Sequence, residues 1–171
     1  VYIIQIVFYY LNFMYIYNTN RILLNSNFYI FDNFIVLRYT KMPHLLELFS
    51  GTGSVVRAFR SIGWETTSVD IDTKSGATII TDIGSWEYKA FAPGYFDCVW
   101  ASPPCTHYSR ARTTALTPRD LEGSDRLVER VLEIIRYHNP ATYFIENPQS
   151  GLLKSRDVVR GLSFSDTSYC K

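Results

Sequence analysis

One stretch of this sequence, HLLELFSGTGS at residues 44–54, decides its fold class. His44–Phe49 is a short apolar run, the pattern of a buried strand. Ser50–Ser54 is rich in glycine and serine and is typical of a loop. Apolar residues then recur at helical spacing up to Gly63, a residue type that commonly ends helices. The stretch therefore predicts a strand, a glycine-bearing loop and a helix in direct succession.

The rest of the chain continues this alternation of strands and helices. Apolar or β-branched runs predict four more strands, at Glu65–Val69, Ala77–Thr81, Phe96–Ala101 and Ala141–Ile145. An apolar stripe predicts a helix over Asp125–His138, which an Asn-Pro step ends. Strands that alternate with helices indicate βαβ units. We therefore expect an α/β fold with a mostly parallel sheet and helices on both faces.

Polar or glycine-rich residues follow all five predicted strands. In chain order they are Ser50–Ser54, Asp70, Asp82, Pro103-Pro104-Cys105 and Glu146-Asn147-Pro148. In parallel sheets, ligands bind outside the carboxyl ends of the strands. The sequence therefore predicts one site at this edge rather than five unrelated loops.

The composition is that of an ordinary globular domain. The 171 residues are 47% hydrophobic and 19% charged, which is enough for one domain with a sizeable core. A formal net charge of +1 excludes a polybasic nucleic-acid binder, and the apolar content excludes a disordered chain. Three scattered cysteines, Cys98, Cys105 and Cys170, favour neither a disulfide framework nor a metal site. We expect no metal and a reducing, intracellular setting.

The first 41 residues differ in composition from the rest. Only four of them are charged, and they hold 12 of the 27 aromatic residues. We favour an extension outside the functional protein, because Met42 directly precedes the first well-patterned strand. Two alternatives stay open: Val1–Tyr17 is a short membrane or interfacial segment, or the region adds strands. The chain is therefore divided into an extension over 1–41 and a folded domain over 42–171.

The loop and two acidic residues suggest a nucleotide-like ligand. The glycines of Gly51-Thr52-Gly53 let the backbone approach a ligand closely, although a plain tight turn has the same pattern. Asp70 lies about 20 residues beyond the loop at a strand end, where an acid accepts hydrogen bonds from ribose hydroxyls. Asp72 competes for this role. Asp82 either accepts a hydrogen bond from an adenine amino group or caps a helix.

Cys105 and Glu146 are the candidate catalytic residues. Two prolines hold Cys105 stiffly at the mouth of the sheet, which suits a nucleophile. Attack requires the thiolate, which Arg110 and Arg112 are near enough in sequence to favour. Glu146 beside a stiff Asn-Pro step fits an acid that protonates or hydrogen-bonds a substrate ring nitrogen. A buried structural cysteine and a solvated glutamate are the alternatives, and the structural role is the better interpretation of Cys98.

In this order the motifs resemble those of the DNA (cytosine-5) methyltransferases, over about residues 44–156. Phe49-Ser50-Gly51-Thr52-Gly53-Ser54 resembles the family's S-adenosylmethionine loop. Asp70 stands where the family binds the ribose, and Asp82-Ile83 stands where it binds the adenine. The resemblance implies the Rossmann-like fold of S-adenosylmethionine-dependent methyltransferases, with that molecule as cofactor.

The resemblance also assigns the reaction. Pro104-Cys105 matches the nucleophile motif, with Pro104 beside the cofactor, and Glu146-Asn147 matches the catalytic glutamate motif. Cys105 would add to C6 of a cytosine flipped out of double-stranded DNA, Glu146 would stabilise charge at N3, and C5 would take the methyl group. The expected substrate-binding residues are Ser109, Arg110, Arg112 and Asn147, although a solvated loop is also typical of the arginines.

The chain departs from the family's pattern in three places. Asp70 stands where the family usually has Glu, and Thr106-His107 stands where Gln commonly follows the nucleophile. The family then continues with a Gln-x-Arg-x-Arg motif, a target-recognition region and a returning helix, which are not found up to Lys171. We therefore expect a partial catalytic domain with a fold incomplete at the carboxyl terminus. It would be inactive alone, and a separately encoded carboxyl-terminal half is a candidate partner.

Two other functions stay open. One is a methyltransferase that makes N4-methylcytosine or N6-methyladenine, because Ser102-Pro103-Pro104 begins like the Ser/Asp-Pro-Pro-aromatic motif of those enzymes. Cysteine in the fourth place and the later Glu-Asn-Pro weigh against it. The other is a truncated or split copy that binds cofactor or a partner without turnover. The setting is expected to be cytoplasmic, or viral or phage-encoded in a host cell, in restriction–modification, infection or regulation; a membrane role is the remote alternative.

Overall fold

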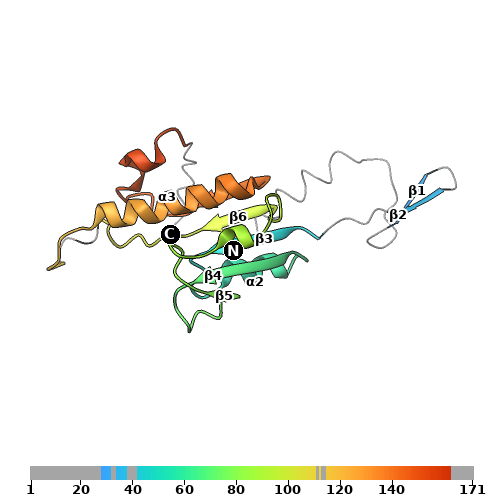
Figure 1. The fold of residues 1–171 in the computed structure, drawn as a ribbon, viewed down its shortest axis with the longest axis horizontal. Coiled ribbons are helices and arrows are strands. Elements are labelled where there is room, and N and C mark those ends of the chain that lie inside the picture. The colour runs from blue at the N-terminus through green and yellow to red at the C-terminus, as the bar shows by residue number, and fades with distance from the viewer. Residues whose placement is uncertain (1–27, 32–33, 38–41, 111, 113–114, 163–171) are drawn as a thin grey trace.

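The structure is a computed structural model that describes residues 28–31, 34–37, 42–110, 112 and 115–162. Its centre is a five-stranded, wholly parallel sheet with strand order β5-β4-β3-β6-β7 (Figure 1). The strands are β3 (His44–Leu48), β4 (Glu65–Asp70), β5 (Ile79–Ile80), β6 (Cys98–Ala101) and β7 (Thr142–Ile145).

Two α-helices cover opposite faces of this sheet (Figure 1). α2 (Ser54–Arg60) packs on the face that carries Leu45, whereas α3 (Leu121–His138) packs on the face that carries Leu46. Successive strand residues point to opposite faces, so a sheet that is covered on both sides needs apolar residues at both positions. The predicted parallel sheet with helices on both faces is confirmed.

The α3 side holds the larger part of the core. Val128, Val131 and Ile134 on this helix are each 0% exposed. Burying one such side chain contributes about 1.5–3 kcal/mol relative to leaving it in water. The helix is therefore firmly fixed on the sheet, and groups attached to it are held in place.

The order of the strands sets the position of the site. β3 is the central strand, with β4 on one side and β6 on the other, so the chain reverses its direction of travel across the sheet here. In parallel sheets such a reversal opens a crevice at the carboxyl ends of the strands. This order is Rossmann-like, and the predicted fold class is confirmed for the described residues.

Two element boundaries differ from the sequence predictions. The expected strand over 77–81 pairs only at Ile79–Ile80, because Thr78 bonds with Ser68 through the side chains of both residues instead of through the ladder. The helix expected over 125–138 begins earlier, at Leu121. The side chain of Asp120 accepts a hydrogen bond from the backbone N–H of Gly123 (2.7 Å) and so caps the earlier start.

Three short 3₁₀ helices complete the described fold. They are η1 (Tyr88–Ala90), η2 (Leu153–Ser155) and η3 (Asp157–Val159). η1 follows the β5 loop, whereas η2 and η3 lie beyond β7 and pack against α3. Tyr88 of η1 bonds to Glu133 on α3, and Leu153 of η2 packs with Tyr108 of the turn after Cys105.

Before the five-stranded sheet lies a separate hairpin. β1 (Phe28–Phe31) and β2 (Phe34–Leu37) pair with each other in antiparallel register. In the described part of the chain neither strand joins the larger sheet. This backbone agrees with the alternative of additional strands for this region. The membrane alternative falls on Val1–Tyr17, outside the described residues, and the dispensability of 1–41 stays a prediction.

Within the described ranges, none of the helices combines the length and the apolar character that crossing a membrane requires.

Candidate active site

The loop after β3 is held in a tight turn against the end of β4. Gly51 and Gly53 have positive φ angles of 51° and 68°, a region that other residues adopt only with strain. Phe49, at φ 59°, also lies in this region, which costs a residue with a Cβ about 1–2 kcal/mol. The backbone N–H of Gly51 donates to Oδ2 of Asp70 at 2.7 Å. The end of β4 therefore helps to hold a strained turn at the mouth of the sheet.

Asp70 joins this loop to a neighbouring hollow. Its other oxygen, Oδ1, accepts a hydrogen bond from the backbone N–H of Asp72 at 2.8 Å. A carboxylate oxygen accepts more than one hydrogen bond, so both oxygens keep capacity for a hydroxyl. Asp70 lines the hollow, whereas Asp72 does not and accepts from the backbone N–H of Lys74 (2.8 Å). The geometry favours Asp70 over Asp72 as the predicted ribose ligand.

The hollow beside Asp70 has a volume of about 180 Å³. Five of the predicted cofactor residues line it, namely Phe49, Asp70, Asp82, Ile83 and Pro104. The remaining lining residues are Val69, Ile71, Thr81 and Leu127. Apolar walls suit a flat aromatic ring, and a carboxylate at the rim suits ribose hydroxyls. The residues present therefore fit the adenosine part of S-adenosylmethionine.

Asp82 is held in its own turn at this rim. Its Oδ1 accepts from the backbone N–H of Gly84 at 2.7 Å, and its carbonyl accepts from Ser85. The residue therefore begins a turn rather than capping a helix, which was the alternative. Its second carboxylate oxygen remains for a ligand.

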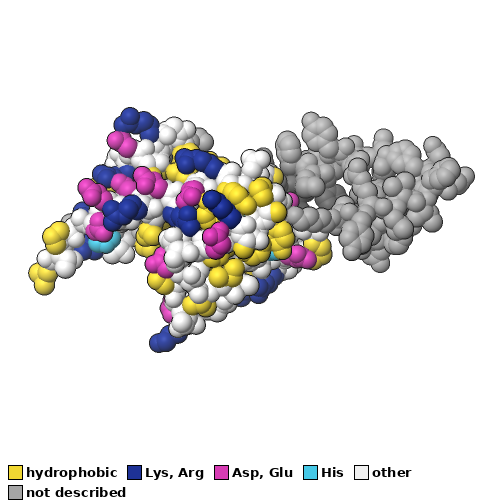
Figure 2. Space-filling model, viewed as in Figure 1, with side chains coloured by type: hydrophobic (Ala, Val, Ile, Leu, Met, Phe, Trp, Pro, Cys, Tyr) yellow, Lys and Arg dark blue, Asp and Glu magenta, His cyan; other side chains and the backbone are white. Residues whose placement is uncertain are grey.

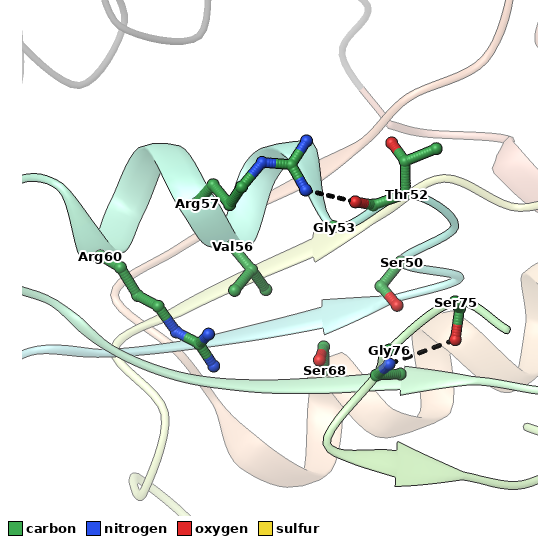
Figure 3. Close-up of a pocket in the computed structure, with 10 residues that line it drawn as sticks. Ser50, Thr52, Gly53, Val56, Arg57, Arg60, Ser68, Ser75 and Gly76 are labelled. Atoms are coloured by element: carbon green, nitrogen blue, oxygen red, sulfur yellow. Dashed lines mark hydrogen bonds between the residues drawn. The ribbon is translucent and has the colours of Figure 1, made fainter. Parts of the chain in front are cut away.

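The other predicted cofactor residues lie elsewhere in the loop. Ser50, Thr52 and Gly53 line a second hollow of about 100 Å³, which Figure 3 shows between α2 and the loop that carries Ser75 and Gly76. Gly51 and Ser54 are exposed and line neither hollow. Of the loop residues 49–54, Phe49 alone lines the hollow beside Asp70, and the backbone N–H of Gly51 bonds to Asp70.

Glu47 is a buried acid beneath the loop, and the sequence analysis missed it. Only 3% of the residue is exposed, and burial raises its pKa to about 7. Its Oε2 accepts from the backbone N–H of Val56 at 3.2 Å, so it ties the start of α2 to β3. One charged residue inside an otherwise apolar strand is the signal that reveals such a group in a sequence.

Cys105 begins the turn that follows β6. Its carbonyl accepts from the backbone N–H groups of Tyr108 (3.0 Å) and Ser109 (2.8 Å). The residue is half-buried, whereas Cys98 is only 1% exposed, and burial raises the pKa of the Cys98 thiol to about 12. Of these two cysteines, only Cys105 is accessible to a substrate. The structural role of Cys98 fits its burial.

The predicted catalytic glutamate lies next to this turn. The backbone N–H of Glu146 donates to the carbonyl of Ala101 at 2.8 Å, which continues the pairing of β7 with β6. The side-chain amide of Asn147 donates to the carbonyl of Pro103 at 3.0 Å. Its Oδ1 is buried and has no donor among the described residues. The Pro-Cys and Glu-Asn motifs, 40 residues apart, are therefore joined directly.

The arginines of the following loop have different surroundings. Nη2 of Arg112 donates to the carbonyl and hydroxyl of Thr117, and Nη1 of Arg119 donates to the carbonyls of His107 (2.7 Å) and Ser109 (2.8 Å). Both side chains therefore stabilise the loop after Cys105 by bonding to its own residues. Arg110 is exposed and is better placed to meet a phosphate.

The surface seen in Figure 2 carries no uniform positive field. Lys and Arg side chains are interspersed with Asp and Glu side chains over α3, in keeping with the near-zero net charge of the chain. Contacts with a phosphate backbone on this face would therefore be local rather than spread over the molecule.

A cluster of three side chains supports the cofactor side of the site. The hydroxyl of Tyr88 donates to Oε1 of Glu133 (2.8 Å), and Arg130 donates to Oε2 of the same carboxylate (2.7 Å). Arg130 also donates to the carbonyls of Ile83 (3.1 Å) and Trp86 (2.9 Å). This Tyr88 cluster therefore fixes the loop that carries Ile83, one of the residues lining the hollow, to α3. The sequence analysis assigned it no role.

In the part of the chain that the structure describes, no group of three or more His, Cys, Asp or Glu side chains converges in a way that could hold a metal ion.

Comparison with known proteins identifies a matching family and several relatives. The sequence profile described as C-5 cytosine-specific DNA methylase matches residues 44–160. A probable DNA (cytosine-5)-methyltransferase of Frog virus 3 (isolate Goorha) is 35% identical over 145 residues, covering 74% of this chain and 66% of the relative. The type II methyltransferase M.HpaII of Haemophilus parainfluenzae is 32% identical over 126 residues, covering 68% of this chain and 34% of the relative.

The chain thus spans less than two thirds of the length of either relative. Among solved structures, the Entamoeba histolytica methyltransferase EhMeth is similar with a TM-score of 0.47 and 21% identity, covering 70% of this chain and 41% of that one. The profile match covers more than half of the chain and includes all the motifs that the sequence analysis singled out. The chain therefore belongs to the family of C-5 cytosine-specific DNA methylases.

Proposed function

We propose that this chain carries the catalytic part of a DNA (cytosine-5)-methyltransferase, which methylates double-stranded DNA with S-adenosylmethionine as methyl donor. Family membership and the names of both relatives support this reaction. The observation that carries the proposal is the hydrogen bond from Asn147 to the carbonyl of Pro103. It brings together, at neighbouring strand ends, the two motifs that the reaction needs.

The hollow next to the cysteine turn supports S-adenosylmethionine as the cofactor. Asp70 accepts hydrogen bonds from the ribose, and Ile83 and Leu127 cover the adenine. Pro104 lines the same hollow and precedes Cys105, so the cofactor and the thiol share one short segment. When it is bound, S-adenosylmethionine supplies an electrophilic methyl group.

Cys105 is the nucleophile in this proposal. Its thiolate adds to C6 of the cytosine, and the electron pair of the C5–C6 double bond moves to C5. C5, which is a poor nucleophile in the free base, can then accept a methyl group. Loss of the C5 proton to a base re-forms the double bond and expels the thiolate, so the cysteine is regenerated. The cytosine must first leave the stack, which costs a few kcal/mol.

Glu146 stabilises the charge that this addition places on the ring. Its carboxyl group hydrogen-bonds N3 of the cytosine, so the negative charge that moves into the ring meets a proton donor. The buried Oδ1 of Asn147, which has no donor among the described residues, is the atom suited to accept from the substrate. Asn147 therefore has two roles, one toward the cysteine turn and one toward the base.

Contacts with DNA in this proposal come from the loop after Cys105. Arg110 is exposed and binds a phosphate. Ser109 lies at the start of the loop, where its backbone N–H donates to the carbonyl of Cys105. Arg112 acts from inside the loop, through its bonds to Thr117, and shapes the surface that meets the substrate.

The product of the reaction tests this function. The full chain is incubated with double-stranded DNA and methyl-labelled S-adenosylmethionine, and the DNA is then hydrolysed to nucleosides. In the presence of a carboxyl-terminal half, we expect labelled 5-methyldeoxycytidine from the native chain and from Cys98→Ser, and none from Cys105→Ser. Label in N4-methyldeoxycytidine or N6-methyldeoxyadenosine would instead support an exocyclic-amino methyltransferase.

A separately encoded carboxyl-terminal half remains part of the proposal. Within the described sheet, β7 pairs on one side with β6 and forms an edge, and exposed edges of this kind readily accept another strand. Label transfer that appears only after adding such a half in trans would support this partner. Cofactor binding without label transfer under either condition would indicate a non-catalytic copy.

A further inference from the structure

A second cluster on α3 joins segments that are far apart in the sequence. The hydroxyl of Tyr108 donates to Oδ1 of Asp125 at 2.8 Å. Arg156 donates to Oδ2 of the same carboxylate through Nε (2.9 Å) and Nη2 (2.5 Å). Tyr108 is fully buried, and only 17% of the Asp125 side chain is exposed. These three residues are called the Tyr108 cluster below.

Tyr108 is itself a residue of the cysteine turn. Its backbone N–H donates to the carbonyl of Cys105 at 3.0 Å. Its ring packs with Val128 of α3 and with Leu153 beyond β7. The ring has few torsional freedoms and its hydroxyl is anchored, so the position of Asp125 determines the position of the turn.

The segment beyond β7 closes the cluster from the other side. The backbone N–H of Leu152 donates to the carbonyl of Tyr108 at 2.9 Å, and that of Gly151 donates to the carbonyl of Pro148 at 2.8 Å. A Cβ atom on Gly151 would lie 2.9 Å from that same Pro148 oxygen, which is closer than real side chains approach. Glycine therefore allows this segment to cross the cysteine turn and bring Arg156 to α3.

The charges within the cluster support each other. Burial raises the pKa of Asp125, but the hydrogen bonds from Arg156 and Tyr108 together outweigh it and leave the pKa below its usual value. The bond to Asp125 raises the pKa of Arg156. For Tyr108, burial is the main cause of a raised pKa, and the bond to Asp125 adds to it. At neutral pH the cluster is thus a carboxylate between two protonated donors.

We propose that the Tyr108 cluster is a positioning device that holds the cysteine turn in register with the Glu-Asn loop. The contacts form a closed circuit. The cysteine turn is anchored to α3 through Asp125, the segment beyond β7 is anchored to the same carboxylate through Arg156, and Asn147 joins that segment back to Pro103. The inference rests on the proposed function, because the group that is positioned is the nucleophile.

The reactivity of Cys105 tests this proposal without requiring methyl transfer. The full chain with Cys170→Ser is alkylated with iodoacetamide between pH 7 and 9, and mass spectrometry follows Cys105 and Cys98 separately. Tyr108→Phe removes one hydroxyl and frees the turn. We expect the Cys105 alkylation rate to rise about three- to tenfold, the factor that corresponds to losing one hydrogen bond.

Two internal controls separate positioning from a general loss of stability. Cys98 lies inside β6 and is 1% exposed, so continued protection of this thiol shows that the sheet is intact. Tyr88→Phe removes the same kind of hydrogen bond from the Tyr88 cluster, on the cofactor side of α3. We expect this variant to leave the Cys105 rate unchanged.

Rescue by a conservative variant gives a second test. Arg156→Ala should raise the Cys105 rate as Tyr108→Phe does. Arg156→Lys keeps the charge but loses the two-pronged geometry, so it should restore the native rate only in part. If Asp125→Asn unfolds the chain, which reaction of Cys98 would reveal, the tyrosine and arginine variants still decide the question.

The DNA reaction provides the matching functional readout. With S-adenosylmethionine and DNA that contains 5-fluorocytosine, Tyr108→Phe should form its covalent adduct more slowly while its alkylation is faster. The DNA concentration at half-saturation should stay the same. If the native chain forms no adduct even when a carboxyl-terminal half is added, the proposed function fails, and the alkylation rates still decide the positioning role. Equal Cys105 rates in Tyr108→Phe, Arg156→Ala and native protein, with Cys98 protected in all three, would overturn the inference.

Discussion

The Tyr108 and Tyr88 clusters lie on one helix and use the same three kinds of group, yet they differ in what they join. In the Tyr88 cluster, Glu133 and Arg130 are three residues apart on α3, and the glutamate side chain is 51% exposed. In the Tyr108 cluster the arginine comes from beyond β7, and the Asp125 side chain is 17% exposed. Water screens the first ion pair strongly and the second much less.

The two clusters also serve different halves of the site. The middle of α3 holds the loop that carries Ile83, and the first turns of the helix hold the turn that carries Cys105. One helix, fixed by its buried apolar face, thus contacts both the loop beside the hollow and the turn that carries the proposed nucleophile. Two clusters built from the same kinds of group therefore differ in their structural role, because they connect different segments of the chain.

Removing each acid in turn is the strongest way to break this comparison. Asp125→Ala leaves the fully buried hydroxyl of Tyr108 without an acceptor. We expect the free energy of unfolding to fall by about 2–3 kcal/mol, within the range for an unpaired buried polar group. Glu133→Ala should cause a clearly smaller loss, because the Glu133 side chain is 51% exposed and water already screens its ion pair with Arg130. Urea denaturation of both variants measures the difference, and equal losses would contradict the comparison.

A substitution on the cofactor side should separate the two halves of the site. Asp70→Ala removes an acceptor from the hollow and releases Gly51. We expect S-adenosylmethionine binding, measured by calorimetry, to weaken by about 1–3 kcal/mol, the scale for hydrogen bonds to a charged group. The alkylation rate of Cys105 should not change. A loss of binding with Asp72→Ala instead would mean that the other carboxylate holds the ribose.

The pH dependence of stability sharpens the contrast between buried acids. Glu47 keeps its proton up to about pH 7 in the folded chain, whereas its ordinary pKa is 4.5. The unfolded chain therefore binds fewer protons between these values, and the free energy of unfolding falls as pH rises through this window. Asp125, with its lowered pKa, acts oppositely: its contribution is present above its unfolded pKa and is lost as pH falls.

The variant Glu47→Gln isolates the first of these effects. One pKa unit corresponds to about 1.4 kcal/mol, so the rise from 4.5 to about 7 sets an upper limit of about 3 kcal/mol on the change across this window. Urea denaturation at pH 4.5, 6 and 7.5 should show a slope in the native chain that the variant lacks. Parallel slopes in both proteins would exclude Glu47 as the source.

Deleting residues 1–41 should have the smallest effect. The described residues that form the two clusters and the two hollows all lie at position 49 or later. A chain that begins at Met42 should be at least as soluble, with unchanged cofactor affinity and unchanged Cys105 reactivity. Unfolding of the shortened chain, detected by circular dichroism, would show that the region packs into the core.

The sequence predicted the part of the site that follows from local pattern. Each strand could be recognised from its own apolar run, and the carboxyl ends of parallel strands share one edge, so the positions of Asp70, Cys105 and Glu146 followed. The resemblance to a family added their roles. Asp70, Asp82 and Pro104 then converged on one hollow, as a shared cofactor site requires.

The supporting contacts could not be predicted in the same way. Tyr108, Asp125 and Arg156 are spread over 49 positions, and no periodicity links them. Their meeting depends on how the segment beyond β7 folds back over α3, which is a tertiary property. The earlier start of α3 does have a local signal in the sequence, because Asp120 is a favourable N-cap residue.

Covalent trapping tests the central claim, that Cys105 is the nucleophile toward cytosine, most directly. The native chain, Cys98→Ser and Cys105→Ser are each incubated with S-adenosylmethionine and duplex DNA that carries 5-fluorocytosine, with and without a carboxyl-terminal half. Fluorine blocks the elimination that frees the thiol, so we expect a denaturation-resistant adduct from the native chain and from Cys98→Ser, and none from Cys105→Ser. An adduct that survives Cys105→Ser would contradict the account.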